Sequence, residues 1–247
     1  MAKLLAVIPA RGGSKGLPNK NIRELAGLPL IAHSILLAKM CPEIDRVIVS
    51  TDSDAIAKVA QDYRCDVPFV RPPELASDEA PLWPVLRHAL QTVEQLDGVR
   101  YEYLQLLDPT APARFPSDVT EALQRLKENS SADGIIFVSR PEFNPIWHCV
   151  VDRDGWLADL FPEAANVHRR QDVPVVYRII STMNIWRADF VRREETTWRG
   201  NGKFLMYEIP DVRALDIDDL DGFQRAEALI RSGLVHLPWL KDKVIAG

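Results

Sequence analysis

Short apolar runs alternate along this chain with longer segments in which apolar residues recur at helical spacing. The short runs predict strands at residues 4–8, 47–49, 101–107, 135–138 and 205–209. The longer segments predict helices at residues 29–40, 81–96 and 219–231 and in the stretches that carry Ile56 and Val119. We expect one of residues 50–52 to cap the helix that carries Ile56, and Ser117 to cap the helix that carries Val119. This alternation is typical of an α/β fold with a mainly parallel sheet.

The pattern changes after Pro141, where prolines and tryptophans interrupt the helical spacing. Asp154-Gly155 lies between two short apolar runs, which predicts a β-hairpin. We therefore assign residues 1–140 and 205–247 to an α/β core and residues 141–204 to a β-rich protruding segment. An apolar hairpin that leaves the main domain needs cover, and a second subunit is a natural source of it.

The composition of the 247 residues is that of an ordinary globular chain, with 47% hydrophobic and 26% charged residues. The net charge of -5 gives no electrostatic reason to bind nucleic acid or an anionic membrane, so an anion site must be local. No apolar run approaches the roughly 18 residues of a membrane span, and we expect a cytoplasmic protein. The three cysteines are widely spaced, which speaks against a disulfide framework or a zinc site.

The loop after the first predicted strand carries a local excess of positive charge. Residues 11–23 hold four basic residues, Arg11, Lys15, Lys20 and Arg23, and no acidic one. Gly12, Gly13 and Gly16 let backbone N–H groups approach a ligand, and nucleotides bind at this edge of a parallel sheet. The glycines fit neither GxxxxGK[ST] nor GxGxxG. We expect a polyphosphate here, the plain alternative being a tight turn with solvated lysines.

A pair of carboxylates, Asp216 and Asp218, flanks Ile217 near the end of a predicted strand. Side chains two residues apart in a strand point to the same side, so both carboxylates can face one ion. Mg²⁺ combines one or two carboxylates with phosphate oxygens and water, which predicts a magnesium–triphosphate site. The alternative is an acidic run at a helix start, a role that we assign to Asp219 and Asp221.

The string IPARGGSKGLPNKN at residues 8–21 resembles the signature of the acylneuraminate cytidylyltransferase (CMP-sialic acid synthetase) family. The strings VSTDS (49–53), RPPELA (71–76), LDPTAP (107–112), RRQDVP (169–174) and DID (216–218) follow in the order of that family. The resemblance implies a three-layer α/β/α Rossmann-like nucleotidyltransferase fold. It also implies a homodimer in which the protruding segment helps to close the neighbour's active site.

The resemblance further implies a set of nucleotide-binding residues and a metal pair. The residues expected at the CTP site are Arg11, Gly12, Gly13, Ser14, Lys15, Lys20, Asn21 and Arg71. Their types suit the task, because arginine and lysine offset the charge of a triphosphate and Asn21 offers an amide to the base edge. The DID element is where this family holds its metal, so Asp216 and Asp218 are expected to bind Mg²⁺.

The expected acceptor residues are Asp108, Arg170, Gln171 and Asn184. Asp108 stands where the family usually carries glutamine, and Ile180, Ser181 and Asn184 replace the asparagine, glycine and tyrosine of its NGA-x-Y-like element. An ionised Asp108 is unfavourable beside a carboxylate but favourable beside an amine, a hydroxyl or a metal-bound group. Arg170 can pair with an acceptor carboxylate or phosphonate, although it also fits a plain surface arginine. We therefore expect a modified nonulosonic acid or another small anion as the acceptor.

The function predicted from the sequence is magnesium-dependent transfer of CMP from CTP to an acidic sugar, with release of pyrophosphate. Arg11, Lys15 and Lys20 are the expected catalytic residues, because they offset charge on the leaving pyrophosphate. Three alternatives stay open: cytidylyl transfer to a phosphonate or phosphate headgroup, use of another nucleotide, and a nucleotide-binding regulatory protein without catalysis.

Overall fold

A mixed sheet of seven strands forms the centre of the computed structural model, which describes residues 3–180 and 183–240 without the side chains of Ala164 and Arg170. The strands run in the order β11-β6-β10-β5-β1-β4, with β9 paired to β6. β1 is parallel to β4 and β5, and β6 is parallel to β11, whereas β9 and β10 are antiparallel to their neighbours. Their bounds are β1 Leu4–Pro9, β4 Arg46–Ser50, β5 Tyr103–Leu106, β6 Gly134–Ser139, β9 Arg178–Ile179, β10 Ile185–Arg187 and β11 Phe204–Glu208.

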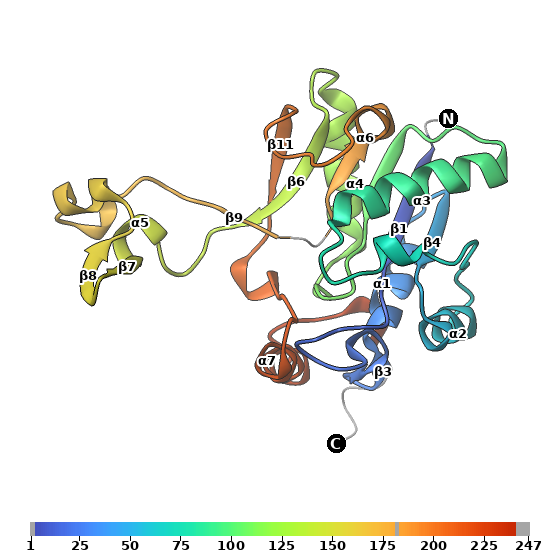
Figure 1. Cartoon of the computed structure of the whole chain (residues 1–247), viewed down its shortest axis with the longest axis horizontal. Helices are drawn as coiled ribbons and strands as arrows, with labels where there is room; N and C mark the ends of the chain where they lie inside the picture. Colours follow the sequence, from blue (N-terminus) through green and yellow to red (C-terminus); the bar gives the residue numbers. More distant parts are fainter. Residues whose placement is uncertain (1–2, 181–182, 241–247) are drawn as a thin grey trace.

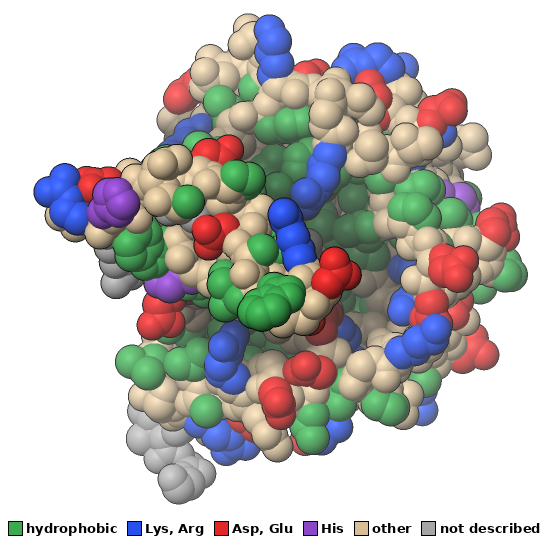
Figure 2. Space-filling model, turned by 60° about the vertical axis from the view of Figure 1, so that its left-hand side comes forward, with side chains coloured by type: hydrophobic (Ala, Val, Ile, Leu, Met, Phe, Trp, Pro, Cys, Tyr) green, Lys and Arg blue, Asp and Glu red, His purple; other side chains and the backbone are tan. Residues whose placement is uncertain are grey.

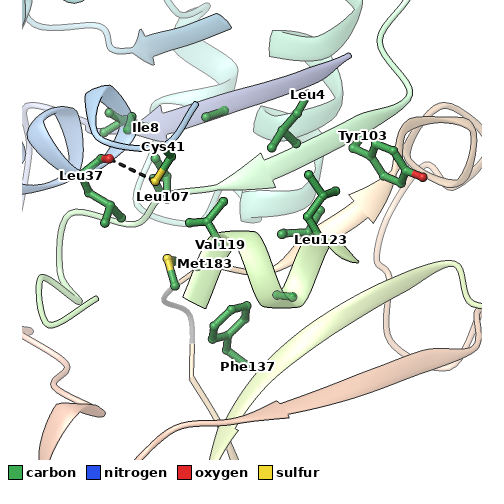
Figure 3. Packing of buried hydrophobic residues seen from close by; sticks show 14 of the residues in the cluster. Leu4, Ile8, Leu37, Cys41, Tyr103, Leu107, Val119, Leu123, Phe137 and Met183 are labelled. Atoms are coloured by element: carbon green, nitrogen blue, oxygen red, sulfur yellow. Dashed lines mark hydrogen bonds between the residues drawn. The ribbon is translucent and has the colours of Figure 1, made fainter. Parts of the chain in front are cut away.

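Helices cover both faces of the sheet (Figure 1). On one face, α1 (Leu30–Lys39), α2 (Asp54–Asp62) and α4 (Pro116–Glu128) pack on Leu4, Ala6 and Ile8 of β1. On the other, α3 (Leu82–Asp97) and α6 (Ala188–Arg193) pack on Leu5 and Val7. Figure 3 shows the first of these clusters, with α4 side chains lying among those of the sheet. The predicted α/β/α arrangement is confirmed, and it follows from strands that are apolar on both faces.

A third apolar cluster lies beside the sheet and brings two distant parts of the chain together. It contains Leu17 from the cationic loop and Ile217 from the DID element. The small hairpin of β2 (Glu24–Leu25) and β3 (Leu28–Pro29) and the helix α7 (Leu220–Arg231) supply further side chains. Since Leu17 and Ile217 are both buried in it, this cluster sets the distance between the cationic loop and the aspartate pair.

The protruding arm, residues 141–177, leaves the core between β6 and β9 (Figure 1). It holds α5 (Pro145–His148), β7 (Val150–Arg153), β8 (Trp156–Asp159) and the 3-10 turns η3 (Pro162–Asn166) and η4 (Arg170–Asp172). The predicted hairpin is confirmed, because β7 and β8 pair antiparallel around Asp154 and Gly155, whose φ values are 54° and 84°. Trp156 and Leu157 at its tip are 79% and 77% exposed.

Several boundaries differ from those that the sequence predicts. The arm is shorter, since β10 lies between β5 and β6 and α6 packs on α3. Residues 185–193 therefore belong to the core, because Trp186 and Phe190 bury their rings there. Ser117 lies inside α4, where Asp118 instead accepts a hydrogen bond from the backbone N–H of Phe115, and Ser53 caps α2. None of the helices in the described ranges is long and apolar enough to cross a membrane.

Candidate active site

A cleft of about 450 Å³ opens where β1 and β5 end, and it gathers residues that lie far apart in the sequence. Eight of the predicted site residues line it: Arg11, Ser14, Lys15, Lys20, Asn21, Arg71, Asp108 and Asp218. Four segments supply them: the cationic loop after β1, the Arg71 segment, the loop after β5 and the DID element. The carboxyl ends of parallel strands are where open α/β sheets bind nucleotides.

Hydrogen bonds between side chains and backbone groups of the cationic loop hold the loop in place. Gly12 N–H donates to Asp52 Oδ1 at 3.0 Å, and the Asn21 amide donates to the carbonyl oxygen of Arg11 at 3.1 Å. A Cβ atom on Gly16 would collide with the carbonyl oxygen of Asp218, so only glycine lets the two segments approach this closely. Gly12 and Gly13 do not line the main cleft, and a Cβ on Gly13 would meet open space.

Lys20 joins the cationic loop to the DID element. Its side chain is buried, with only 9% of the residue exposed. The ammonium donates to the carbonyl oxygen of Ile217 at 2.6 Å and pairs with Asp218 Oδ1 at 3.2 Å. A lysine held by two partners at the floor of a cleft is preorganised toward an anion that enters it.

The other three cations of the cleft are Arg11, Lys15 and Arg71, and each is bonded to a polar group of the protein. Arg11 and Lys15 both pair with Asp78, at 2.6 Å for the Lys15 ammonium. Arg71 is buried, and its Nε donates to the Ser50 hydroxyl at 3.1 Å. Burial lowers the pKa of Arg71 to about 10, so its guanidinium keeps its charge at neutral pH. The cleft is therefore strongly cationic in a protein whose net charge is -5.

The sequence predicts the aspartate pair at the end of a strand, but the structure places it in a segment outside the strands, just before α7. Ile217 is fully buried and its N–H donates to the carbonyl oxygen of Thr110 at 2.9 Å, while Asp216 and Asp218 are exposed on either side. Although Asp216 is exposed as a whole, its carboxyl group is partly desolvated, which raises the pKa of Asp216 above its ordinary value, and the charges of Asp218 and Asp108 raise it further. A divalent cation would offset this repulsion.

The donor set at this pair fits Mg²⁺ in the way that a nucleotide site requires. Among the described residues there is no cluster of three or more His, Cys, Asp or Glu side chains arranged to hold a metal. Asp216 and Asp218 are hard oxygen donors, and Mg²⁺ in such sites completes its shell with phosphate oxygens and water. The two aspartates beside a polyphosphate cleft satisfy that chemistry.

The four predicted acceptor residues are not brought together. Asp108 lines the cleft, where its Oδ1 accepts hydrogen bonds from the N–H and the hydroxyl of Thr110, and burial raises its pKa. Asn184 is buried directly before β10, and its Oδ1 accepts a hydrogen bond from the N–H of Phe137 in β6 at 2.9 Å. Gln171 is exposed on the arm. The side chain of Arg170 lies outside the described residues.

A second cavity of about 270 Å³ adjoins the cleft through Leu82, which lines both. Asn184 lies on its wall together with Ile179. Its other lining side chains include three tryptophans, Trp83, Trp186 and Trp198. The indole N–H of Trp186 is buried without a hydrogen-bond partner among the residues that the structure describes. This cavity extends the site beyond the nucleotide cleft.

Three residues of the site were missed in the sequence. Asp52 and Thr110 lie inside the VSTDS and LDPTAP strings, whose internal contacts only the fold reveals. Asp78 follows the RPPELA string by two residues, and its link to Arg11 spans 67 positions. An isolated aspartate in a loop carries no periodic signal, so only its position after that string could have marked it.

The fold and the cleft define an enzyme of the nucleotidyltransferase class, with a cationic nucleotide cradle facing an aspartate pair. Residues 5–193 match the family described as Cytidylyltransferase, and the chain belongs to that family. It is 35% identical over 232 residues to post-translational flagellin modification protein B of Campylobacter coli, covering 94% of this chain and 96% of that protein. It is also 35% identical to CMP-N,N'-diacetyllegionaminic acid synthase of Campylobacter jejuni, covering 93% and 96%.

The fold is also found in solved structures of low sequence identity. One is CMP:2-keto-3-deoxy-manno-octonic acid synthetase complexed with CTP, with a TM-score of 0.69 and 17% identity over 94% of this chain and all of that one. Another is 4-diphosphocytidyl-2C-methyl-D-erythritol synthase, with a TM-score of 0.67 and 14% identity over 93% and 99%. At these identities the likeness concerns the fold.

Proposed function

We propose that this enzyme transfers CMP from CTP to a nonulosonic acid and releases pyrophosphate. The observation that carries the proposal is one cleft lined by Arg11, Lys15 and Lys20 together with Asp218 of the DID element. The relative of Campylobacter jejuni named CMP-N,N'-diacetyllegionaminic acid synthase supports the choice of nucleotide and of acceptor class. We expect the reaction in the cytoplasm.

In the proposed reaction, the anomeric hydroxyl of the acceptor attacks the α-phosphorus of CTP. A new P–O bond forms, the bond from the α-phosphorus to the bridging oxygen breaks, and pyrophosphate leaves with that electron pair. Arg11 and Lys15 offset charge on the leaving group from one side, and Lys20 does so from the floor of the cleft. Asp108 is our candidate for the group that accepts the hydroxyl proton.

Mg²⁺ would be held by Asp216 and Asp218 and by phosphate oxygens of the substrate. When bound, it would supply charge neutralisation at the triphosphate. Lys20 keeps Asp218 in place by its ion pair, and the buried Ile217 anchors the segment that carries both aspartates. The protein thus positions the metal-binding residues through its core.

The cavity beside the cleft supports an acceptor that carries acylated amino groups. Its tryptophan walls suit the methyl part of an acyl group. Asn184 would then act from the cavity wall, with its amide nitrogen toward the sugar. This arrangement favours a diacetylated acceptor of the legionaminic acid type.

We further propose a homodimer in which the arm of one subunit closes the acceptor site of the other. Figure 2 shows hydrophobic side chains on the arm, which comes forward in front of the core in this view. Arg170 and Gln171 would then reach the acceptor of the partner subunit from the arm.

The test is incubation with CTP and Mg²⁺ and a set of acceptors, followed by mass measurement of any CMP conjugate. The acceptors are N,N'-diacetyllegionaminic acid, N-acetylneuraminic acid, pseudaminic acid and an aminoalkyl phosphonate. We expect the diacetylated acids to give a CMP conjugate and equimolar pyrophosphate. A conjugate with the phosphonate alone would overturn the acceptor class. CTP binding without turnover on any acceptor would indicate a regulatory protein.

A further inference from the structure

The carboxylate of Asp78 is the meeting point of two cations of the nucleotide cleft. Arg11 donates to its Oδ1, and the Lys15 ammonium lies 2.6 Å from its Oδ2. Asp78 belongs to the loop between the 3-10 turn η2 (Pro73–Leu75) and α3, so it approaches the cationic loop from the opposite rim. Ser77 and Ala80 of this loop line the cleft itself.

We propose that Asp78 is an internal counter-ion that determines which anions the cleft accepts, because an incoming phosphate must displace it from Arg11 and Lys15. This inference rests on the proposed function, since it assigns the triphosphate to this cleft. A carboxylate presents two acceptor oxygens to these cations, as a phosphate group does. Asp78 is ionised at neutral pH, because the hydrogen bonds from Lys15 and then Arg11 lower its pKa.

The four cations of the cleft differ in how firmly they are held. Lys20 and Arg71 are buried and bonded to backbone oxygens, so they stay in place whether or not an anion is bound. Lys15 is 80% exposed in its side chain, and Asp78 is 32% exposed, so their pair lies in water. Exposed ion pairs of this kind are weak and can exchange partners.

The exchange explains how one cleft can bind a triphosphate and then release pyrophosphate. A fully charged magnesium–triphosphate engages all the cations and the aspartate pair, which outweighs the loss of the two Asp78 contacts. Pyrophosphate or inorganic phosphate alone makes fewer contacts and competes with Asp78 for Arg11 and Lys15. Asp78 therefore weakens the binding of small anions and favours departure of the product.

The experiment compares Asp78→Asn with Glu79→Gln, which removes the same charge from the adjacent exposed residue. Dissociation constants for inorganic pyrophosphate and for CTP are measured by calorimetry at fixed ionic strength, with a chelator to remove divalent ions. We expect Asp78→Asn to bind pyrophosphate about 2- to 30-fold more tightly, which is the range that two exposed ion pairs represent, and Glu79→Gln to match the wild type. Asp78→Ser should behave as Asp78→Asn does.

Unchanged or weaker pyrophosphate binding in Asp78→Asn would overturn the inference, and so would equal tightening in Glu79→Gln, which would reflect net charge alone. A wild-type protein that binds neither CTP nor pyrophosphate would instead overturn the proposed function. The two failures are therefore distinguishable.

Discussion

The nucleotide cleft and the arm of this enzyme differ in how far the chain's own core holds their side chains in place. The residues of the cleft are held by the chain's own core, because Leu17 and Ile217 share one buried cluster and Lys20 bonds across it. The arm instead leaves Trp156 and Leu157 in solvent. Large exposed apolar groups are typical of an interaction surface, which supports the proposal that the arm meets a second subunit, whereas the nucleotide cleft is built from residues of one chain.

The largest effect is expected at the centre of the cleft. Lys20→Ala removes the buried cation between the cationic loop and Asp218, and we expect kcat/KM for CTP to fall about 100- to 1,000-fold. Pyrophosphate release measures it, and Lys58→Ala on the exposed side of α2 is the matched control. A loss in Lys58→Ala as large as in Lys20→Ala would show that the cleft has no special part in catalysis.

The next effect concerns the pH dependence of the stability of the core. His33 in α1 is fully buried between the carbonyl oxygen of Leu25 and the indole N–H of Trp239, and burial lowers its pKa to about 4. Between pH 6.5 and pH 4 the unfolded chain therefore takes up a proton that the folded chain does not. The free energy of unfolding should fall by about 3 kcal/mol over this range because of His33.

Denaturant unfolding of wild type and His33→Gln at pH 7 and pH 4 measures this contribution. The advantage of the wild type should shrink by about 3 kcal/mol toward pH 4, while the exposed His236→Gln follows the wild type. A constant difference between wild type and His33→Gln at the two values of pH would contradict the assignment.

The arm should fail in a different way. Replacing Trp156 and Leu157 together with serine removes the most exposed apolar side chains of the hairpin, so the dimer should dissociate about 30-fold more readily or further. Analytical ultracentrifugation over a concentration series measures this, and the secondary structure of the core should not change. Replacing Leu234, an exposed residue outside the arm, with serine is the control. A wild-type protein that is monomeric at all concentrations would refute the dimer.

The smallest of these effects concerns one carboxylate of the metal pair. Asp216→Asn leaves Asp218 and Lys20 in place, so we expect the variant to bind CTP without metal as tightly as the wild type does. The gain in CTP affinity on adding Mg²⁺ should be at least about 10-fold smaller in the variant than in the wild type. Calorimetry with and without Mg²⁺ gives both numbers, and Asp221→Asn in the first turn of α7 is the control. An identical response to Mg²⁺ in Asp216→Asn and in the wild type would exclude Asp216 from the metal site.

The sequence predicts the parts of this structure that rest on local patterns. The apolar run of β1 and the spacing in α1 and α3 locate these elements, and the glycines and cations after β1 locate the cleft. Long-range pairing is invisible in such patterns. Three-residue β10 is too short to show a period, and its place between β5 and β6 depends on partners about 50 to 80 positions away.

The same limit applies to individual site residues. The sequence predicts Asn184 as an acceptor-binding residue, and the structure adds that its oxygen accepts a hydrogen bond from a backbone N–H of β6, a contact that no local pattern encodes. Whether its nitrogen also meets the acceptor stays a prediction. Asp78 became visible only when the fold placed its loop against the cationic loop.

The central claim is that this cleft transfers the nucleotidyl group of CTP. The most direct measurement follows the phosphorus atoms of CTP labelled separately at the α and the γ position, with Mg²⁺ and N,N'-diacetyllegionaminic acid. The account predicts that the α label enters the sugar conjugate and that the γ label is recovered in pyrophosphate. Transfer of the γ label to the sugar, or release of the α label in free CMP without a conjugate, would contradict it.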